Sequence, residues 1–238
     1  MSVEGGPNIV EEGLVFYLDA ANPRSYVSES LNSYSLINSD ISGSLINDVI
    51  FESGSQGSWF FGFDAVDDYI QTNTRMSQAY DQTDITLNFW FKMVGDPGVN
   101  YHGLIDALSK NDNNRRARIL INKGRDRTLY IISGIQRTVF FLQTLSLDTW
   151  YFFTLTKDSV NGSKIYINAE DNGGEAADTG YISGLGGSTW PNTVFGVGAE
   201  IPTYFLNGNI ANIQCYNKAL TPIEIQQNYN ALKHRFGL

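Results

Sequence analysis

The sequence is poor in the residues that most metal sites and many catalytic sites use. Its 238 residues include one cysteine, Cys215, and two histidines, His102 and His234. A single cysteine excludes an intramolecular disulfide and any zinc site built from several cysteines, and we expect Cys215 to be a small buried side chain. Because the two histidines lie far apart in the sequence, a Ser/His/Asp or Cys/His catalytic arrangement has little support.

Long hydrophobic runs and excess positive charge are also missing. No unbroken apolar run of about 18 residues is present, and the chain does not begin with a basic stretch followed by an apolar one, so we expect neither a membrane span nor a signal peptide. The 16 basic and 25 acidic residues give a net charge of −9. This charge argues against nucleic acid as the main partner of the surface.

Short runs of aromatic and β-branched residues are abundant. In residues 85–93, apolar side chains alternate with mostly polar ones, which predicts a strand with one buried face. Further strands are predicted at residues 14–18, 59–63, 118–121, 129–132, 138–142, 150–156, 164–168, 194–197 and 210–216. Turns rich in Gly, Asn, Asp and Ser separate these runs, with no long amphipathic helix between them. This organisation indicates an all-β protein built as an antiparallel β-sandwich.

One short helix is predicted near the C-terminus. Residues 221–224 supply a threonine N-cap, a proline at the first helical position and a capping-box glutamate. Ile225, Tyr229 and Leu232 then fall on one face, which should dock the helix on the sandwich. Residues 26–49 and 168–188 are rich in small polar residues and are predicted to be long connections.

Five segments resemble, in order, the concanavalin A-like, laminin-G-like jelly rolls. They are GLVFYLDAANPRSY (13–26), FFGFDAVDDYI (60–70), DITLNFWFK (84–92), TWYFFTLTKD with KIYINAED (149–158 and 164–171), and FLNGNIANIQCYNKALTPIEIQQNYNALK (205–233). The family's usual Asn-Gly hairpin tip is here Asn168–Ala169. The resemblance spans most of the chain and implies a single jelly-roll domain at residues 13–238, and the Gly- and Pro-containing residues 1–12 are expected to form an N-terminal arm. It also implies a binding or structural role, because most such domains are non-catalytic.

The opening PNIVEEGLVFYLDAANPRSY, residues 7–26, is similar to jelly-roll proteins of tailed-bacteriophage virions. That resemblance implies a non-catalytic virion structural protein, either a capsid decoration or a tail or neck component. Such a protein would be assembled in the host cytoplasm, contact other virion proteins and form homo-oligomers. The alternative is a lectin module that contacts host-surface glycans, with calcium as a possible aid. A polysaccharide hydrolase ranks third, because no E-x-D-x-E run places carboxylates on one strand face.

Candidate ligand-binding residues fall into two groups. A sugar platform would use aromatic side chains, and the candidates are Trp90, Tyr101, Trp190 and Tyr204. Trp90 lies on the polar face of its predicted strand, so it is either exposed or covered by another layer. Calcium would use oxygen donors, which members of the family sometimes place in loops, and these are Asp67, Asp68, Asn111, Asp112, Asp171 and Asn172. The alternative reading of the acidic groups at residues 64–68 and 81–84 is solvated turn carboxylates.

Half of the basic residues lie between Lys110 and Arg137. This segment has a net charge of +6, whereas the rest of the chain has −15. The candidate docking patch consists of Arg115, Arg116, Arg118, Lys123, Arg125 and Arg127. A solvated strand face explains this cluster of charge. The functional alternative is docking on an acidic neighbouring subunit, an anionic glycan or lipopolysaccharide, since the arginine fork suits carboxylate and phosphate groups. No nucleic-acid recognition motif accompanies the charge.

Overall fold

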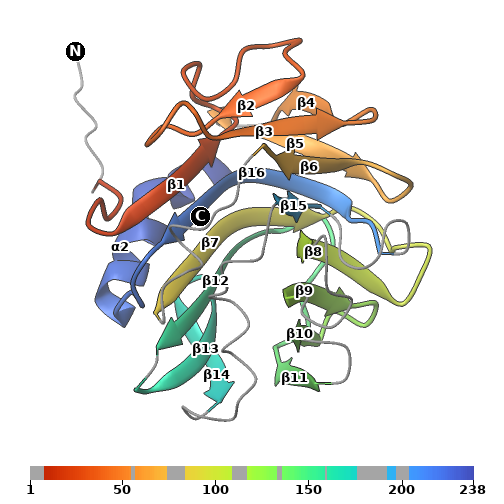
Figure 1. The fold of residues 1–238 in the computed structure, drawn as a ribbon. Coiled ribbons are helices and arrows are strands. Elements are labelled where there is room, and N and C mark those ends of the chain that lie inside the picture. The colour runs from red at the N-terminus through yellow and green to blue at the C-terminus, as the bar shows by residue number, and fades with distance from the viewer. Residues whose placement is uncertain are drawn as a thin grey trace.

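Strands make up nearly all of the regular structure in the computed structural model (Figure 1). The structure describes residues 8–54, 57–73, 84–108, 117–132, 136–158, 160–175, 192–196 and 204–238. The strands are β1 (Leu14–Asp19), β2 (Asn32–Tyr34), β3 (Ser42–Ile46), β4 (Ile50–Ser53), β5 (Trp59–Asp64), β6 (Tyr69–Thr72), β7 (Ile85–Met93), β8 (Tyr101–Leu108), β9 (Ala117–Asn122), β10 (Arg127–Ile132), β11 (Gln136–Phe141), β12 (Trp150–Asp158), β13 (Gly162–Ile167), β14 (Glu170–Glu175), β15 (Asn192–Phe195) and β16 (Asn207–Tyr216). Helix α2 (Pro222–Leu232) and the 3₁₀ turn η3 (Lys233–Phe236) follow.

The strands form two sheets. Sheet A has the order β14-β13-β12-β7-β16-β5-β4, and β1 also pairs with β16. Sheet B has the order β11-β10-β9-β8-β15-β6-β3-β2. Every pairing among the described strands is antiparallel, and strands distant in sequence, such as β7 and β16, lie side by side. The arrangement is that of a concanavalin A-like jelly roll, as predicted.

The main hydrophobic core fills the space between the two sheets. Phe89 of β7 and Phe153 of β12 are each at most 1% exposed, and their rings stack at 4.8 Å. Phe16 of sheet A stacks on Phe195 of sheet B with ring centroids 6.3 Å apart. Such aromatic contacts bury large apolar areas and tie the layers together. Cys215 is also buried in this core, in agreement with the prediction.

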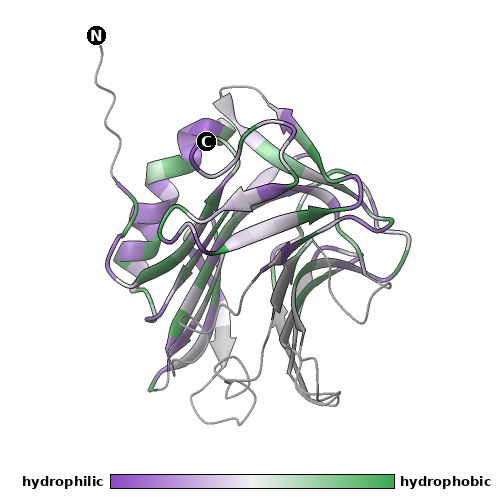
Figure 2. Ribbon diagram, turned by 45° about the horizontal axis from the view of Figure 1, so that its top comes forward, coloured by the Kyte–Doolittle hydropathy of each residue, from purple (hydrophilic) through white to green (hydrophobic). Residues whose placement is uncertain are grey.

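Helix α2 covers the outer face of sheet A (Figure 1). Its capping box is present, because the Glu224 amide donates to Thr221 Oγ1 and the Thr221 amide donates to a Glu224 carboxylate oxygen. Ile225 and Leu232 are buried against the sheet. Figure 2 shows hydrophobic and hydrophilic residues interleaved along the helix, as an amphipathic helix requires. Among the described residues, no helix is long and apolar enough to span a bilayer.

Trp90 lies beneath this cover. Its side chain is fully buried, and its ring stacks on Phe236 at 4.2 Å and on Tyr229 at 5.6 Å. The polar face of the β7 strand is therefore covered by a second layer, one of the two outcomes open from the sequence. The expectation that Trp90 contributes to a sugar platform is wrong, because no part of its ring reaches the surface.

All ten predicted strands are present, but the segments expected to be connections also contain strands. Residues 26–49 include β2 and β3, and residues 168–188 include β14. These strands are rich in Ser, Gly and Asn, and they form because neighbouring strands supply the hydrogen-bonding ladder, which outweighs weak intrinsic propensity. Asn168 and Ala169 both have positive φ, +54° and +67°, so the hairpin keeps the left-handed pair that Asn-Gly favours.

Candidate functional site

An acidic turn and a tyrosine pair lie at the same end of the sandwich. The acidic turn joins β5 to β6, and Asp64 at its start pairs with Asn207 at the start of β16. The Ala65 amide donates to the Leu206 carbonyl at 3.0 Å, which ties the turn to the segment that follows Tyr204. Asn207 in turn donates to the Asp96 carbonyl in the β7–β8 loop, ahead of Tyr101. The turn and the loop lie at the same end in Figure 1.

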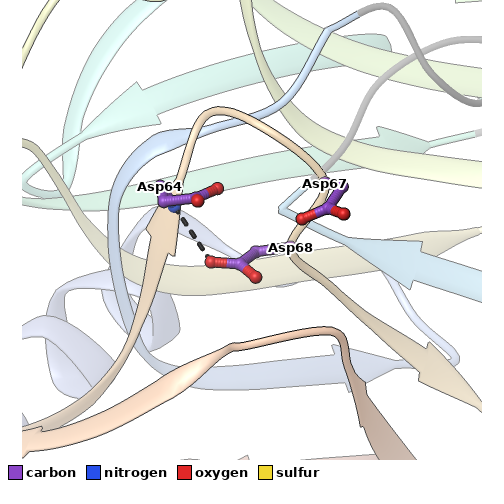
Figure 3. Close-up of side chains that lie close together, drawn as sticks. All are labelled: Asp64, Asp67 and Asp68. Atoms are coloured by element: carbon purple, nitrogen blue, oxygen red, sulfur yellow. Dashed lines mark hydrogen bonds between the residues drawn. The ribbon is translucent and has the colours of Figure 1, made fainter.

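Three carboxylates converge in the acidic turn (Figure 3). One carboxylate oxygen from each of Asp64, Asp67 and Asp68 lies within 4.8 Å of the other two. Local backbone geometry brings them together, because Ala65 has a φ of +68° and the Val66 amide donates to Asp64 Oδ1 at 2.7 Å. This is the self-capping that aspartate provides in tight turns.

Asp68 differs from its two exposed neighbours because it is only 2% exposed. Its Oδ2 accepts from the Asp64 amide at 3.1 Å, whereas its buried Oδ1 has no hydrogen-bond partner. Burial, followed by the charge of Asp64, raises the pKa of Asp68 to about 6. The reading of solvated turn carboxylates therefore holds for Asp64 and Asp67 and is wrong for Asp68.

The acidic turn has the donor chemistry of a calcium site. Within the described part of the chain, no lysine or arginine forms an ion pair with Asp64, Asp67 or Asp68. Three carboxylates without a nearby counter-charge suit a hard cation with oxygen ligands. Asp64 was not among the sequence's candidate donors. The sequence signal for Asp64 was its position four residues before Asp68, because a tight turn brings residues at that spacing close together.

The other candidate donors are separate from this turn. Asp171 lies on β14, where its carboxylate pairs with Lys164 at 2.9 Å and accepts from the Gly173 amide. The Asn172 side chain donates to the Glu170 carbonyl. Asn111 and Asp112 lie outside the described residues.

Two of the four aromatic candidates come together. The rings of Tyr101 and Tyr204 meet edge to face, with centroids 5.2 Å apart and an interplanar angle of 86°. Both side chains are half-buried, so each presents part of a ring at the surface. Trp190 lies outside the described residues.

The predicted basic docking patch is described only in part. Lys123 is exposed in the β9–β10 turn. Arg125, by contrast, donates to the Leu145 carbonyl at 2.9 Å and pairs with Asp96 at 2.8 Å, so its guanidinium is engaged within the chain instead of being free to dock. Its left-handed backbone, with a φ of +61°, belongs to the same tight turn. The structure places Arg118 in β9 and Arg127 in β10, while Arg115 and Arg116 lie outside the described residues.

The family of the chain follows from comparison of its sequence. Residues 49–226 match the family of laminin G-type domains described as the concanavalin A-like lectin/glucanases superfamily. This match spans most of the chain, which therefore belongs to that superfamily. No curated protein matches the sequence.

Solved structures share the fold at low sequence identity. The chain is similar to the receptor-binding domain of botulinum neurotoxin D (TM-score 0.66, 16% identity, 91% of this chain and 52% of that one). It is also similar to the binding domain of Paraclostridial Mosquitocidal Protein 1 (TM-score 0.69, 15% identity, 92% and 52%). A third similar structure is Trypanosoma rangeli sialidase in complex with 2,3-difluorosialic acid (TM-score 0.68, 14% identity, 97% and 35%). The chain thus spans about half or less of each matched structure, and these likenesses establish the fold alone.

Proposed function

We propose that this chain is a non-catalytic carbohydrate-binding module whose ligand contacts the Tyr101–Tyr204 pair. The observation that carries the proposal is a pair of partly exposed rings in edge-to-face contact, at the same end of the sandwich as the acidic turn. Aromatic faces cover the apolar face of a sugar ring, while nearby oxygen and amide groups orient its hydroxyls. Two structures with this fold are a toxin receptor-binding domain and a sialidase bound to a sugar derivative, which supports a glycan as the ligand class.

Burial of Asp68 favours binding over hydrolysis. A carboxyl group with a pKa of about 6 has the acidity of a general acid. However, a glycosidase needs that group beside the scissile bond, and Asp68 is 2% exposed with its free oxygen buried. The buried Asp68 carboxyl group is better placed to stabilise the turn or to bind a cation than to protonate a substrate.

The test is a glycan array probed with the full chain and two tyrosine variants. We expect saturable binding of at least one glycan on the array, and Tyr204→Ala should abolish binding of that glycan without changing the melting temperature. Tyr34→Ala is the matched control, because Tyr34 is an exposed tyrosine on β2 at the edge of sheet B. Equal loss in both variants, or an array without any bound glycan, would refute the proposal.

Calcium at the acidic turn is part of this proposal. Asp64, Asp67 and Asp68 would hold the ion, which would neutralise their mutual repulsion. Chelation should then lower the melting temperature of the wild-type chain, since a ligand that binds only the folded state stabilises it. Asp67→Asn should show the chelated melting temperature with or without calcium. A wild-type melt that calcium and chelator leave unchanged would remove the ion from the proposal.

We further propose that the module is displayed on the virion of a tailed phage, as a capsid decoration or as a tail or neck component. This placement rests on the resemblance of the opening residues 7–26 to virion jelly rolls. Mass spectrometry of purified particles from the source should detect the chain in stoichiometric, symmetry-related copies. Its absence from such particles would leave a free lectin as the remaining reading.

A further inference from the structure

A row of side chains crosses the outer face of sheet A beside η3. Lys92 of β7 pairs with Trp150 of β12 on one side and with Asn209 of β16 on the other. Asn209 pairs with Gly62 of β5, which pairs with Ile50 of β4. Because directly opposed residues of neighbouring strands share a face, these five positions form one continuous line on the sheet surface.

The ammonium group of Lys92 is held between two aromatic rings. Lys92 Nζ lies 5.4 Å from the centroid of the Trp150 ring and 5.6 Å from that of the Phe60 ring. The two rings are themselves 5.6 Å apart, and Trp150 also contacts Phe236 at 4.8 Å. Cation–π contacts on both sides restrict a side chain that is otherwise highly mobile. A positive charge is therefore fixed at one point of the surface.

No carboxylate in the described part of the chain neutralises this charge. Lys92 forms no ion pair there, although it is half-buried. Lys164, by comparison, is more exposed and still pairs with Asp171 at 2.9 Å. A half-buried ammonium group whose three donors lack an anionic partner is available to an external anion.

Asn209 adds a second polar group without a partner in the described residues. It is 7% exposed, yet its side-chain amide makes no hydrogen bond to them, and its polar atoms are not sealed from solvent. The nearby Asn207 amide, in contrast, donates to the Asp96 carbonyl. An amide held in place by the surrounding sheet supplies one donor and one acceptor to a ligand at modest entropic cost.

We propose that this row, from Trp150 to Ile50, binds a sugar that bears a carboxylate. The Lys92 ammonium group pairs with the carboxylate, the Asn209 amide binds hydroxyl groups, and the half-buried Trp150 ring covers the apolar face of the sugar. A neutral sugar fits less well, because it would displace water from the Lys92 ammonium group without supplying a negative charge in return. The inference rests on the proposed carbohydrate-binding function and names a ligand class and a second surface.

One carboxylate on the same face sets the orientation. Glu52 lies opposite Phe60 on the exposed edge strand β4. It would repel an anionic group at the Ile50 end of the row. The ligand carboxylate therefore lies at the Trp150 side of Lys92, and the remainder of the sugar extends toward Asn209.

The test is calorimetric titration of the full chain with two matched oligosaccharides. One ends in glucuronate and the other in glucose, so they differ only in the carboxylate. We expect the acidic ligand to bind at least about 10-fold more tightly, and Lys92→Met, which keeps an apolar stem between the rings, to remove that preference. Asn209→Ala should weaken binding of both ligands, because its hydroxyl contacts are common to both.

Glu52→Gln provides a test in which the expected result is a gain of binding and not a loss. Glu52 is exposed on an edge strand, so its replacement should leave the fold intact and strengthen binding of the acidic ligand by about 2- to 5-fold. Tyr204→Ala separates this site from the proposed tyrosine site, because it should leave the glucuronate titration unchanged. Glycan binding that depends on Tyr204 but not on Lys92, or equal affinity for the two oligosaccharides, would overturn this inference and leave the proposed function standing. A chain that binds no glycan at all would overturn both.

Discussion

The ion pair between Asp19 and Arg235 joins the first strand of the sandwich to the η3 turn at the other end of the chain. Arg235 donates through Nη1 and Nη2 to the two carboxylate oxygens of Asp19, at 2.9 and 2.8 Å. The two side chains are 8% and 13% exposed for Asp19 and Arg235, respectively. The Tyr17 hydroxyl and the Ala21 amide also donate to the Asp19 carboxylate, at 2.9 and 3.0 Å. The carboxylate is therefore held by four donors and has little contact with water.

Arg235→Met removes two of these donors and leaves a buried charge without its partner. Breaking a buried pair in this way costs about 3–5 kcal/mol. Because the Tyr17 and Ala21 donors remain, we expect a value near the lower end, about 3 kcal/mol. For a chain of this length, that loss corresponds to a fall in melting temperature of about 6–12 °C.

Urea unfolding and differential scanning calorimetry measure the effect, and a double-mutant cycle with Asp19→Asn isolates the pair. The matched control is Lys164→Met, which breaks an ion pair of similar length, 2.9 Å, whose side chains are 45% and 46% exposed. That control should cost less than about 1 kcal/mol, because solvent screens an exposed pair. Equal losses in Arg235→Met and Lys164→Met, or a coupling energy near zero, would refute the assignment of stability to the burial of the pair.

Three further predictions concern pH and backbone geometry. Burial lowers the pKa of His102 from 6.5 to about 4, so the unfolded chain binds a proton at a higher pH than the folded chain does. The free energy of unfolding should therefore fall by about 3 kcal/mol from pH 6.5 to pH 4. Urea titrations across that range should show this fall, and His102→Leu should remove it. The pKa of Asp68, about 6, exceeds its value in the unfolded chain, so its ionised carboxylate destabilises the fold at pH 7. With chelator present at pH 7, Asp68→Asn should therefore raise the free energy of unfolding by about 1–2 kcal/mol, and a destabilised variant would contradict this. Gly196→Ala should cost about 2–4 kcal/mol in the same unfolding assay, because its φ is +82° and the new methyl group would collide with the Phe63 ring. Gly57→Ala is the control, because Gly57 has a similar φ of +78° but open space around it, and it should cost only about 1–2 kcal/mol. Similar losses in the two variants would rule out the collision.

Periodicity in the sequence predicted many of the strands that carry the core, because alternate large apolar residues favour a strand with one buried face. It did not predict β6 or β8, which contribute Ile70, Leu104 and Ile105 to the core. Residues 85–93 became β7, and residues 150–156 lie within β12. The strands β2, β3 and β14 could not be predicted in this way, since most of their side chains are small or polar and neighbouring strands supply their hydrogen-bonding ladders. The proposed sites divide similarly. Tyr101 and Tyr204 were candidates by residue type, but only the folded chain brings their rings within 5.2 Å.

The sequence alone determined the fold class, the β-sandwich alternation and the capped C-terminal helix, because each depends on local pattern and on the chemistry of a few neighbouring residues. Tertiary structure alone decided which face of each strand is covered and which charges find partners. The helix buries Trp90, the turn after β5 buries Asp68, and the row across sheet A leaves Lys92 between two rings without a carboxylate partner among the described residues. Burial and pairing are properties of segments that meet only after folding, so no local sequence pattern specifies them.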